Sequence, residues 1–195
     1  MSNLLSYRQE SYRKIIHISS SIFPLLLYLL GKYLFQYLII IPLLLLIILD
    51  YSRKYYSIIN NIYFMFFRNV TRKNELNSVS GSTWVFIGII LTTLIFHEKI
   101  TIISLLVLSF SDSAAALIGM KYGKTILFNK SLEGSISFFI TTIIIISLFT
   151  NISILLTITF SAIITTIELI PIYKINDNLL IPLATGTLLY IGGAV

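Results

Sequence analysis

The amino-acid sequence predicts an all-α integral membrane protein, a polytopic bundle of about seven transmembrane helices with a cytoplasmic N-terminus. Hydrophobic residues make up 56% of the 195 residues and charged residues only 11%, whereas soluble domains carry about 25% charged residues. Apolar runs of helical length also recur along the whole chain. So much apolar surface cannot be buried in one small globule, and lipid is its natural solvent. No stretch has room for a separate soluble domain of ordinary size, so residues 1–195 are treated as one integral-membrane domain.

Each of seven apolar runs is compatible with a membrane-spanning helix, which needs roughly 17–25 mostly apolar residues. The runs are residues 18–30, 33–49, 82–96, 100–118, 134–148, 152–170 and 179–194. The first run is expected to belong to a retained helix that begins near Tyr12, because no small-residue cleavage site follows it. Several runs are short, which predicts tilt or local thinning of the bilayer.

A further segment, near residues 55–70, is apolar and aromatic between basic ends. This pattern predicts an interfacial helix that lies in the membrane plane. The segment from residue 121 to residue 133 is expected to be one of the longer connections, on the inner side of the membrane.

The basic residues are distributed unevenly between the two sets of connecting segments. With the N-terminus inside, 12 of the 14 Lys and Arg residues fall in the inner segments, and only Lys32 and Lys99 fall in the outer turns. Cytoplasmic loops carry such an excess, so the net charge of +6 indicates membrane orientation rather than nucleic-acid binding. All acidic residues except Glu98 also belong to the inner half. The positive-inside rule does not require this, so the acids predict a polar site on the cytoplasmic side.

Asp112 is the clearest anomaly in the apolar runs. It lies about two helical turns inside the run of residues 100–118, where a carboxylate costs several kcal/mol unless it is paired, hydrated or bound to a metal. A structural Asp bonded to a neighbouring helix is one interpretation. Intramembrane ionisable groups are functional by default, which favours a catalytic or metal-binding role. Glu168, flanked by apolar residues near the inner end of the sixth run, has the same character.

The segment from Gly119 to Thr125 contains Gly123 and Lys124 and is one residue short of a phosphate-binding P-loop. It also follows a helix where a P-loop follows a strand, so it is not one. Glycines still free backbone amides, and lysines neutralise phosphate. An ordinary basic loop is the alternative interpretation.

The segment Lys130-Ser131-Leu132-Glu133-Gly134 opens the fifth run. Ser131 is expected to cap the helix, with Glu133 in its first turn. The functional alternative is an anion site at the helix N-terminus with Lys130 beside it.

Several charged pairs at the membrane interface have spacings that place both members on one helix face. Arg13 and His17 are four residues apart, and Asp50 and Arg53 are three apart. Such residues are common at membrane interfaces, where long basic side chains reach toward water. Other polar residues beside the apolar runs are Arg72, Glu75, Thr83 and the potential capping pair Asp177-Asn178.

Together these residues match the requirements of phosphoryl transfer. Carboxylates hold a hard divalent cation, and Lys or Arg holds phosphates. A carboxylate or His17 can accept the proton of an attacking hydroxyl. A site at the membrane boundary suits a lipid acceptor and a soluble phosphate donor. The absence of cysteine excludes thiolate metal sites and cysteine nucleophiles.

The order of these motifs resembles one family. The motifs are RKxxH (13–17), DxxR (50–53), RxxE (72–75) followed by GST (81–83), DxxAxxxGxxxGK (112–124), KSxEGS (130–135), the late Glu168 and DNxxxP (177–182). The chain is similar to CTP-dependent lipid-alcohol kinases, which include dolichol, phytol and farnesol kinases and the fungal-type diacylglycerol kinase.

The resemblance implies one catalytic domain that transfers the γ-phosphate of CTP, with Mg²⁺, to the hydroxyl of a polyprenol, dolichol, phytol-type isoprenoid or diacylglycerol. The expected partners are therefore a nucleoside triphosphate and membrane lipid, and not nucleic acid. It further implies a cytoplasm-facing site in the cell membrane of a prokaryote or in the endoplasmic reticulum of a eukaryote. Phosphatidate cytidylyltransferases look similar around the aspartate and the KxxEG element and are the alternative, although their larger C-terminal signature is missing. A small transporter is a further alternative, but no internal repeat is visible.

The resemblance implies the following site residues. The predicted catalytic residues are Asp112 and His17, and the predicted metal ligands are Asp112, Glu133 and Asp177. The predicted nucleotide-binding residues are Arg13, Lys14, Arg53, Arg72, Gly119, Gly123, Lys124, Lys130, Ser131, Glu133, Gly134, Asp177 and Asn178. The same polar pocket is expected to include Asp50, Glu75, Thr83 and Glu168.

Overall fold

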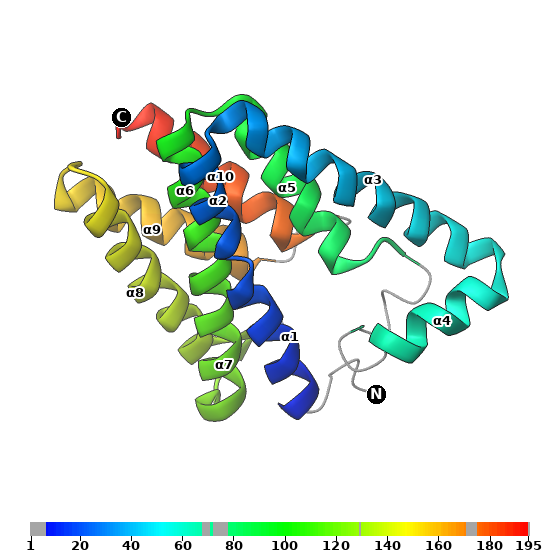
Figure 1. Cartoon of the computed structure of the whole chain (residues 1–195). Helices are drawn as coiled ribbons and strands as arrows, with labels where there is room; N and C mark the ends of the chain where they lie inside the picture. The colour runs from blue at the N-terminus through cyan, green and yellow to red at the C-terminus, as the bar shows by residue number, and fades with distance from the viewer. Residues whose placement is uncertain (1–6, 68–70, 72–77, 129, 171–174, 195) are drawn as a thin grey trace.

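The computed structural model is a bundle of helices of unequal length (Figure 1). It describes the chain except for residues 1–6, 68–70, 72–77, 129, 171–174 and 195. The helices and strands, in chain order, are α1 (Tyr7–Ser19), α2 (Ile22–Leu30), α3 (Lys32–Tyr55), α4 (Ser57–Phe67), α5 (Gly81–Ile95), α6 (Glu98–Leu106), the π-helix η2 (Val107–Ser111), α7 (Asp112–Tyr122), β1 (Ile126–Leu127), β2 (Lys130–Ser131), α8 (Leu132–Phe149), α9 (Ile154–Leu169) and α10 (Asp177–Ile191).

The predicted all-α class is confirmed, and helices are present at each of the predicted runs. Four helical stretches are long and apolar enough to cross a bilayer: Glu10–Leu30, which joins α1 and α2 through a turn, Lys32–Tyr55, Glu98–Tyr122 and Leu132–Phe149. The apolar helices α5, α9 and α10 are shorter. Seven crossings and a cytoplasmic N-terminus therefore stay predictions. A helix, α4, also occupies the segment predicted to be interfacial, and its depth in the bilayer stays a prediction as well.

Large apolar side chains cover the outside of the bundle, as a lipid solvent requires. Along α3, for example, Leu34, Ile41, Leu45 and Ile48 are each more than half exposed. Exposed apolar surface of this extent is unfavourable in water and marks contact with a membrane. The lipid environment predicted from the composition thus agrees with the apolar surface of the bundle.

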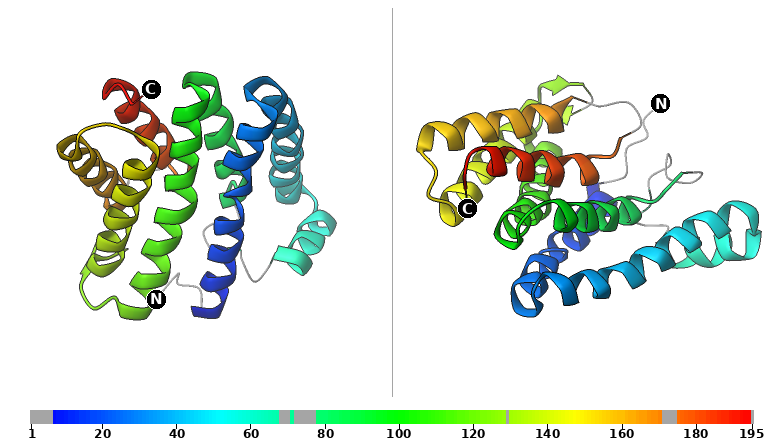
Figure 2. Two further views of the ribbon diagram at one scale, coloured as in Figure 1. Left: turned by 60° about the vertical axis from the view of Figure 1, so that its left-hand side comes forward. Right: turned by 90° about the horizontal axis from the view of Figure 1, so that it is seen from above.

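Two apolar clusters hold the bundle together, and the stretch α6–η2 contributes to both. One cluster joins this stretch to α8, α9 and α10 through residues such as Phe138, Ile164 and Leu189. The other joins α2, α3, α5 and α6 through Leu27, Phe35 and other buried side chains. In the view from above, α9 and α10 lie side by side, and α3 lies on the opposite side of the bundle (Figure 2). The central stretch Glu98–Tyr122 is therefore fixed in position on both sides.

A short hairpin forms within the connection between α7 and α8. Strands β1 and β2 pair antiparallel, with Ile126 opposite Ser131 and Leu127 opposite Lys130. Phe128 adopts a positive φ of 48° in the connection, and the Leu132 amide donates to the Thr125 carbonyl at 2.9 Å. The hairpin is too short to show a periodic pattern in the sequence, but it brings Lys130 back to the start of α8.

Candidate active site

A buried ion pair joins α1 to α7. Lys14 Nζ lies 2.5 Å from Asp112 Oδ2, and the two side chains are 3% and 14% exposed. His17, one turn after Lys14, places Nε2 3.6 Å from the same Oδ2. The cation therefore offsets the cost that a lone intramembrane carboxylate would impose. Asp112 and His17, the predicted catalytic residues, do lie together.

Arg13 and His17 lie four residues apart on α1, so they share a helix face as expected. Arg13 Nη1 pairs with Glu10 Oε1 at 3.2 Å on the same helix. Lys14 and His17, which are three residues apart, face Asp112. Both spacings are compatible with one helix face, so only the packing of α1 on α7 decides which pair enters the site.

A π-helix precedes Asp112 and orients two serines toward neighbouring helices. Ser109 Oγ lies 2.8 Å from Ser20 Oγ, and Thr142 Oγ1 donates to Ser111 Oγ at 3.0 Å. π-bulges inside α-helices occur frequently at functional sites, because the extra residue re-aims the side chains that follow. The sequence shows the serines around Asp112, but the π-helix itself has no readable signal.

Lys130 connects three elements around a pair of carboxylates. Its Nζ donates to Glu168 Oε1 at 2.7 Å, to Asp177 Oδ2 at 2.9 Å and to the Glu168 carbonyl oxygen. Burial acts to lower the pKa of Lys130, but Asp177 and Glu168 outweigh it and raise the pKa above its ordinary value. Lys130 therefore stays charged at neutral pH. It is also close enough to Asp112 for the two charges to interact.

Asn178 joins the start of α10 to both α1 and α5. Its Oδ1 lies 3.1 Å from His17 Nε2, and its Nδ2 donates to the Gly81 carbonyl at 3.0 Å. The expected capping pair Asp177-Asn178 is not the cap of α10. Asn176 caps the helix, because its Oδ1 accepts from the Asn178 amide at 3.0 Å, which leaves both following side chains for long-range contacts.

These residues define one polar cluster at the meeting point of α1, α7, β2, α9 and α10. Its members are Lys14, His17, Asp112, Lys130, Glu168, Asp177 and Asn178. All were predicted site residues, and they come from segments more than 150 residues apart in the sequence. The polar cluster is the part of the described structure with the acids, cations and imidazole that phosphoryl transfer needs.

Asp50 and Arg53 form a second buried pair outside the polar cluster. Arg53 Nη2 lies 3.0 Å from Asp50 Oδ1 and donates to the Ser78 carbonyl at 2.6 Å, and the guanidinium stacks 4.5 Å from the Tyr63 ring centre. Asp50 Oδ2 accepts from Thr83 Oγ1 at 2.6 Å and from a backbone amide at the start of α5. The Arg53 side chain is 0% exposed. This pair braces α3 against α4 and α5, and the nucleotide-binding role expected of Arg53 stays a prediction.

Arg72, predicted to bind the nucleotide, and Glu75, predicted to belong to the polar pocket, lie outside the described residues.

The predicted nucleotide-binding glycines let α7 and α8 approach closely. A Cβ at Gly119 would lie 2.5 Å from Ser131 Oγ, and a Cβ at Gly134 would lie 2.6 Å from the Ala115 carbonyl oxygen. A Cβ at Gly123 would also meet Ser131, at 2.7 Å from its Cβ. Ser131 caps α8 as expected, accepting from the Gly134 amide at 3.1 Å. Gly119, Gly123, Gly134 and Ser131 thus serve close helix packing and capping, and their nucleotide-binding role stays a prediction.

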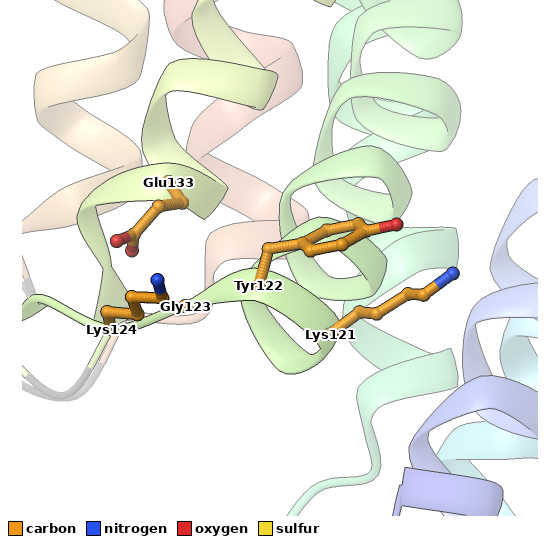
Figure 3. A pocket seen from close by; sticks show the side chains of 5 residues that line it. All are labelled: Lys121, Tyr122, Gly123, Lys124 and Glu133. Atoms are coloured by element: carbon orange, nitrogen blue, oxygen red, sulfur yellow. The ribbon is translucent and has the colours of Figure 1, made fainter.

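An open pocket of about 400 Å³ lies beside the end of α7. It is lined by Lys121, Tyr122, Gly123, Lys124 and Glu133 (Figure 3). Both lysines are exposed, and Glu133 Oε1 accepts from the Thr125 amide at 3.3 Å. Figure 3 shows Glu133 beside Lys124, with Tyr122 and Lys121 on the other side of Gly123. The pocket offers two solvated cations to an anionic ligand.

No three His, Asp or Glu side chains in the described part of the chain are grouped closely enough to hold a metal ion. The predicted ligands Asp112, Glu133 and Asp177 therefore do not form one preformed cluster, because Asp177 pairs with Lys130 and Glu133 turns toward the open pocket. Mg²⁺ needs only one or two carboxylates when substrate phosphates supply the rest. Glu168 Oε2, a buried carboxylate oxygen without a hydrogen-bond partner among the described residues, fits such a cation.

No protein-family model and no solved structure shows a significant match to the chain. An uncharacterized protein of Rickettsia prowazekii is 36% identical over 190 residues, which are 90% of each chain. CTP-dependent diacylglycerol kinase 1 of Saccharomyces cerevisiae is 36% identical over 137 residues, which are 68% of this chain and 47% of the yeast protein. The protein of the same name from Schizosaccharomyces pombe is 32% identical over 143 residues, 69% of this chain and 64% of that protein.

The chain thus spans about half the length of the Saccharomyces kinase and less than two thirds of the Schizosaccharomyces kinase. The matched regions nevertheless cover more than two thirds of the present chain. The chain belongs to the family of membrane proteins that includes the fungal CTP-dependent diacylglycerol kinases.

Proposed function

We propose that this protein is a membrane lipid kinase that transfers the γ-phosphate of CTP to the hydroxyl of diacylglycerol. The observation that carries the proposal is the buried contact of Lys14 and His17 with Asp112, inside a helix bundle with an apolar exterior. The names of the fungal relatives support CTP as donor and diacylglycerol as acceptor. Isoprenoid alcohols, to which the motif order also points, are the competing acceptors.

In the proposed reaction, the oxygen of the lipid hydroxyl attacks the γ-phosphorus of CTP. A new O–P bond forms, the bond from the γ-phosphorus to the bridging oxygen breaks, and CDP leaves with that electron pair. The hydroxyl proton passes to Asp112 or His17 and then to solvent. The products are phosphatidate, CDP and one proton, so atoms and charges balance.

The cations around the acids are suited to the triphosphate. Lys121 and Lys124 at the open pocket provide the first contact with CTP, since both are exposed. Lys130, which stays charged, neutralises charge on the phosphates closer to Asp112. Mg²⁺ would be held by Asp112 and by Glu168 or Asp177 together with phosphate oxygens, and it would neutralise the charge that develops on the leaving group.

The site is proposed to face the cytoplasm, because CTP is soluble and the positive-inside rule places the basic segments there. The acceptor would then enter from the lipid through the apolar surface of the bundle. This arrangement fits a cell membrane in a prokaryote or an endoplasmic reticulum membrane in a eukaryote.

The test uses the full chain reconstituted in nanodiscs with Mg²⁺ and one acceptor at a time: diacylglycerol, farnesol, phytol, dolichol or phosphatidate. CTP labelled at the γ-phosphate is expected to label diacylglycerol, whereas CTP labelled at the α-phosphate is not. Transfer to an isoprenoid alcohol alone would replace the proposed acceptor. Incorporation of the α-label into phosphatidate, with release of pyrophosphate, would identify a cytidylyltransferase instead. Absence of label from every lipid would refute the kinase proposal.

A further inference from the structure

We propose that Asn178 is a positioning residue that holds His17 in its Nε2–H form, so that Nδ1 accepts a hydrogen bond from the hydroxyl of the lipid acceptor. The inference deepens the proposed kinase function and rests on it for the identity of the hydroxyl. The contacts of Asn178 and His17 carry the positioning argument by themselves.

The orientation of the Asn178 amide is fixed by its second partner. Nδ2 donates to the Gly81 carbonyl at 3.0 Å, and a backbone carbonyl can only accept. A flipped amide would place two oxygens against each other, so the oxygen Oδ1 must be the atom facing His17. The surroundings leave Asn178 little freedom, because its side chain is buried and a Cβ at Gly88 would lie 2.5 Å from its backbone oxygen.

The orientation of Asn178 determines the tautomer of His17. Nε2 has two neighbours, Asn178 Oδ1 at 3.1 Å and Asp112 Oδ2 at 3.6 Å. Both atoms are acceptors, so the ring nitrogen between them must carry the hydrogen. A neutral imidazole has one N–H, and Nδ1 is then the unprotonated acceptor.

Nδ1 of His17 is buried and has no hydrogen-bond partner among the described residues. Such atoms are rare in folded proteins, and where they occur a functional role is a usual explanation. A ligand that completes this contact must bring a donor. Phosphate oxygens of CTP are acceptors at neutral pH, whereas the hydroxyl of a lipid alcohol is a donor. The unpaired nitrogen therefore excludes the phosphate oxygens as its partner and matches the hydroxyl of the lipid alcohol, the group that must lose a proton in the transfer.

The tautomer can be read directly from the two ring nitrogens by ¹⁵N nuclear magnetic resonance. The protein has only two histidines, and His97 is exposed and makes no side-chain capping bond. An untagged His97→Gln protein in nanodiscs, labelled in its imidazole nitrogens, therefore reports on His17 alone. The expected spectrum shows a protonated Nε2 and an unprotonated Nδ1. A protonated Nδ1, or equal populations of the two tautomers, would overturn the inference.

Two variants at the start of α10 separate positioning from helix stability. Asn178→Ala removes the acceptor of Nε2–H, so it is expected to mix the tautomers and to lower kcat about tenfold, the loss that corresponds to one hydrogen bond. Asn176→Ala removes the α10 cap and is the matched control. It is expected to lower Tm but to leave the tautomer and kcat unchanged. An Asn178→Ala protein that retains a single Nε2–H tautomer would overturn the positioning role.

Diacylglycerol titration of the same labelled protein tests the hydroxyl contact. Binding is expected to shift the Nδ1 resonance of His17, and an analogue with a methyl ether in place of the hydroxyl is expected to leave it unchanged. Equal shifts with both lipids would overturn the contact. None of these spectra needs turnover, so a protein that shows the expected tautomer without phosphate transfer refutes the kinase proposal and leaves the positioning of His17 standing.

Discussion

Replacement of Asp112 by asparagine separates stability from catalysis at this carboxylate. Lys14 is only 3% exposed, and its Nζ lies 2.5 Å from Asp112 Oδ2. Removing one member of a buried ion pair costs about 3–5 kcal/mol, because the other charge stays buried without its partner. The Asp112 side chain is 14% exposed, so we expect a loss near the lower end, about 3 kcal/mol. Because proteins unfold with free energies of about 5–15 kcal/mol, the Asp112→Asn protein is expected to be much less stable but still folded.

The double variant Lys14→Met/Asp112→Asn removes the buried cation together with its partner. Replacing both members of a buried pair by uncharged side chains is often neutral for stability, so the double variant is expected to regain most of the lost free energy of unfolding. Activity is not expected to return, because the carboxylate is still absent. The expected fall in kcat is on the order of 10²- to 10⁴-fold, the range for loss of a group that moves a proton.

Glu98→Gln is the matched control for this series. It makes the same carboxylate-to-amide change at the other end of the stretch Glu98–Tyr122, and Glu98 forms no salt bridge described for this part of the chain. Unfolding of the purified proteins in detergent gives the stability, and γ-label transfer from CTP to diacylglycerol gives kcat. An Asp112→Asn protein as stable as Glu98→Gln would refute the buried-charge reasoning. A restored double variant that transfers phosphate would refute the catalytic role.

Four further outcomes are expected. Lys130→Met removes hydrogen bonds to charged groups worth about 1.5–3 kcal/mol each and lowers kcat. In the wild type the Lys130 pKa is raised, so the stabilisation by these bonds is present at neutral pH. It is lost only as the pH rises above about 10.4, through the raised pKa. Gly134→Ala places a Cβ 2.6 Å from the Ala115 carbonyl and lowers stability by about 1–3 kcal/mol, measured as Tm. Asp50→Asn leaves a buried guanidinium unbalanced and costs about 3–5 kcal/mol, measured by chemical unfolding. Lys124→Ala raises KM for CTP and changes stability by less than about 0.5 kcal/mol.

Each outcome has a clear counter-result. A Lys130→Met protein whose stability matches the wild type from neutral pH to pH 9 would contradict the three-way contact. An unchanged Tm in Gly134→Ala would show that α7 and α8 tolerate a wider separation. An Asp50→Asn protein with wild-type stability but weaker CTP binding would show that the second buried pair acts in nucleotide binding and not in stability. An unaltered KM in Lys124→Ala would remove the open pocket from CTP binding.

Features that depend on near neighbours in the chain were predictable from the sequence. Apolar runs gave the helices, because a helix in lipid needs only length and hydrophobicity. Ser131 was recognised as a cap, and Asp50 and Arg53 as a pair, because both depend on spacings of about one turn. Asp112 was recognised because a lone carboxylate in an apolar run is costly wherever the helix packs.

Features that depend on helix packing were not predictable. Arg13 and Lys14 were both expected to bind the nucleotide, and only the contact of α1 with α7 shows that Lys14, 98 residues from Asp112 in the chain, pairs with this carboxylate. The glycines after Asp112 were compatible with phosphate binding and with an ordinary basic loop, and only the structure shows that Gly119 and Gly123 lie against Ser131 at the start of α8. The cap of α10 is Asn176, which precedes the expected capping pair Asp177-Asn178. The sequence does not distinguish these positions, because Asp and Asn are both competent caps.

The sequence by itself determined that this chain is a helical membrane protein with an unusual set of acids and bases beside its apolar runs, because hydrophobicity and charge are properties of composition and order. The tertiary structure alone decided which of those groups meet. The contacts of Lys14 with Asp112, of Lys130 with two carboxylates, and of Asn178 with His17 across 161 residues all join different secondary-structure elements. The physical reason is that a buried charge must find a partner, and the packing of apolar helices fixes which partner is within reach.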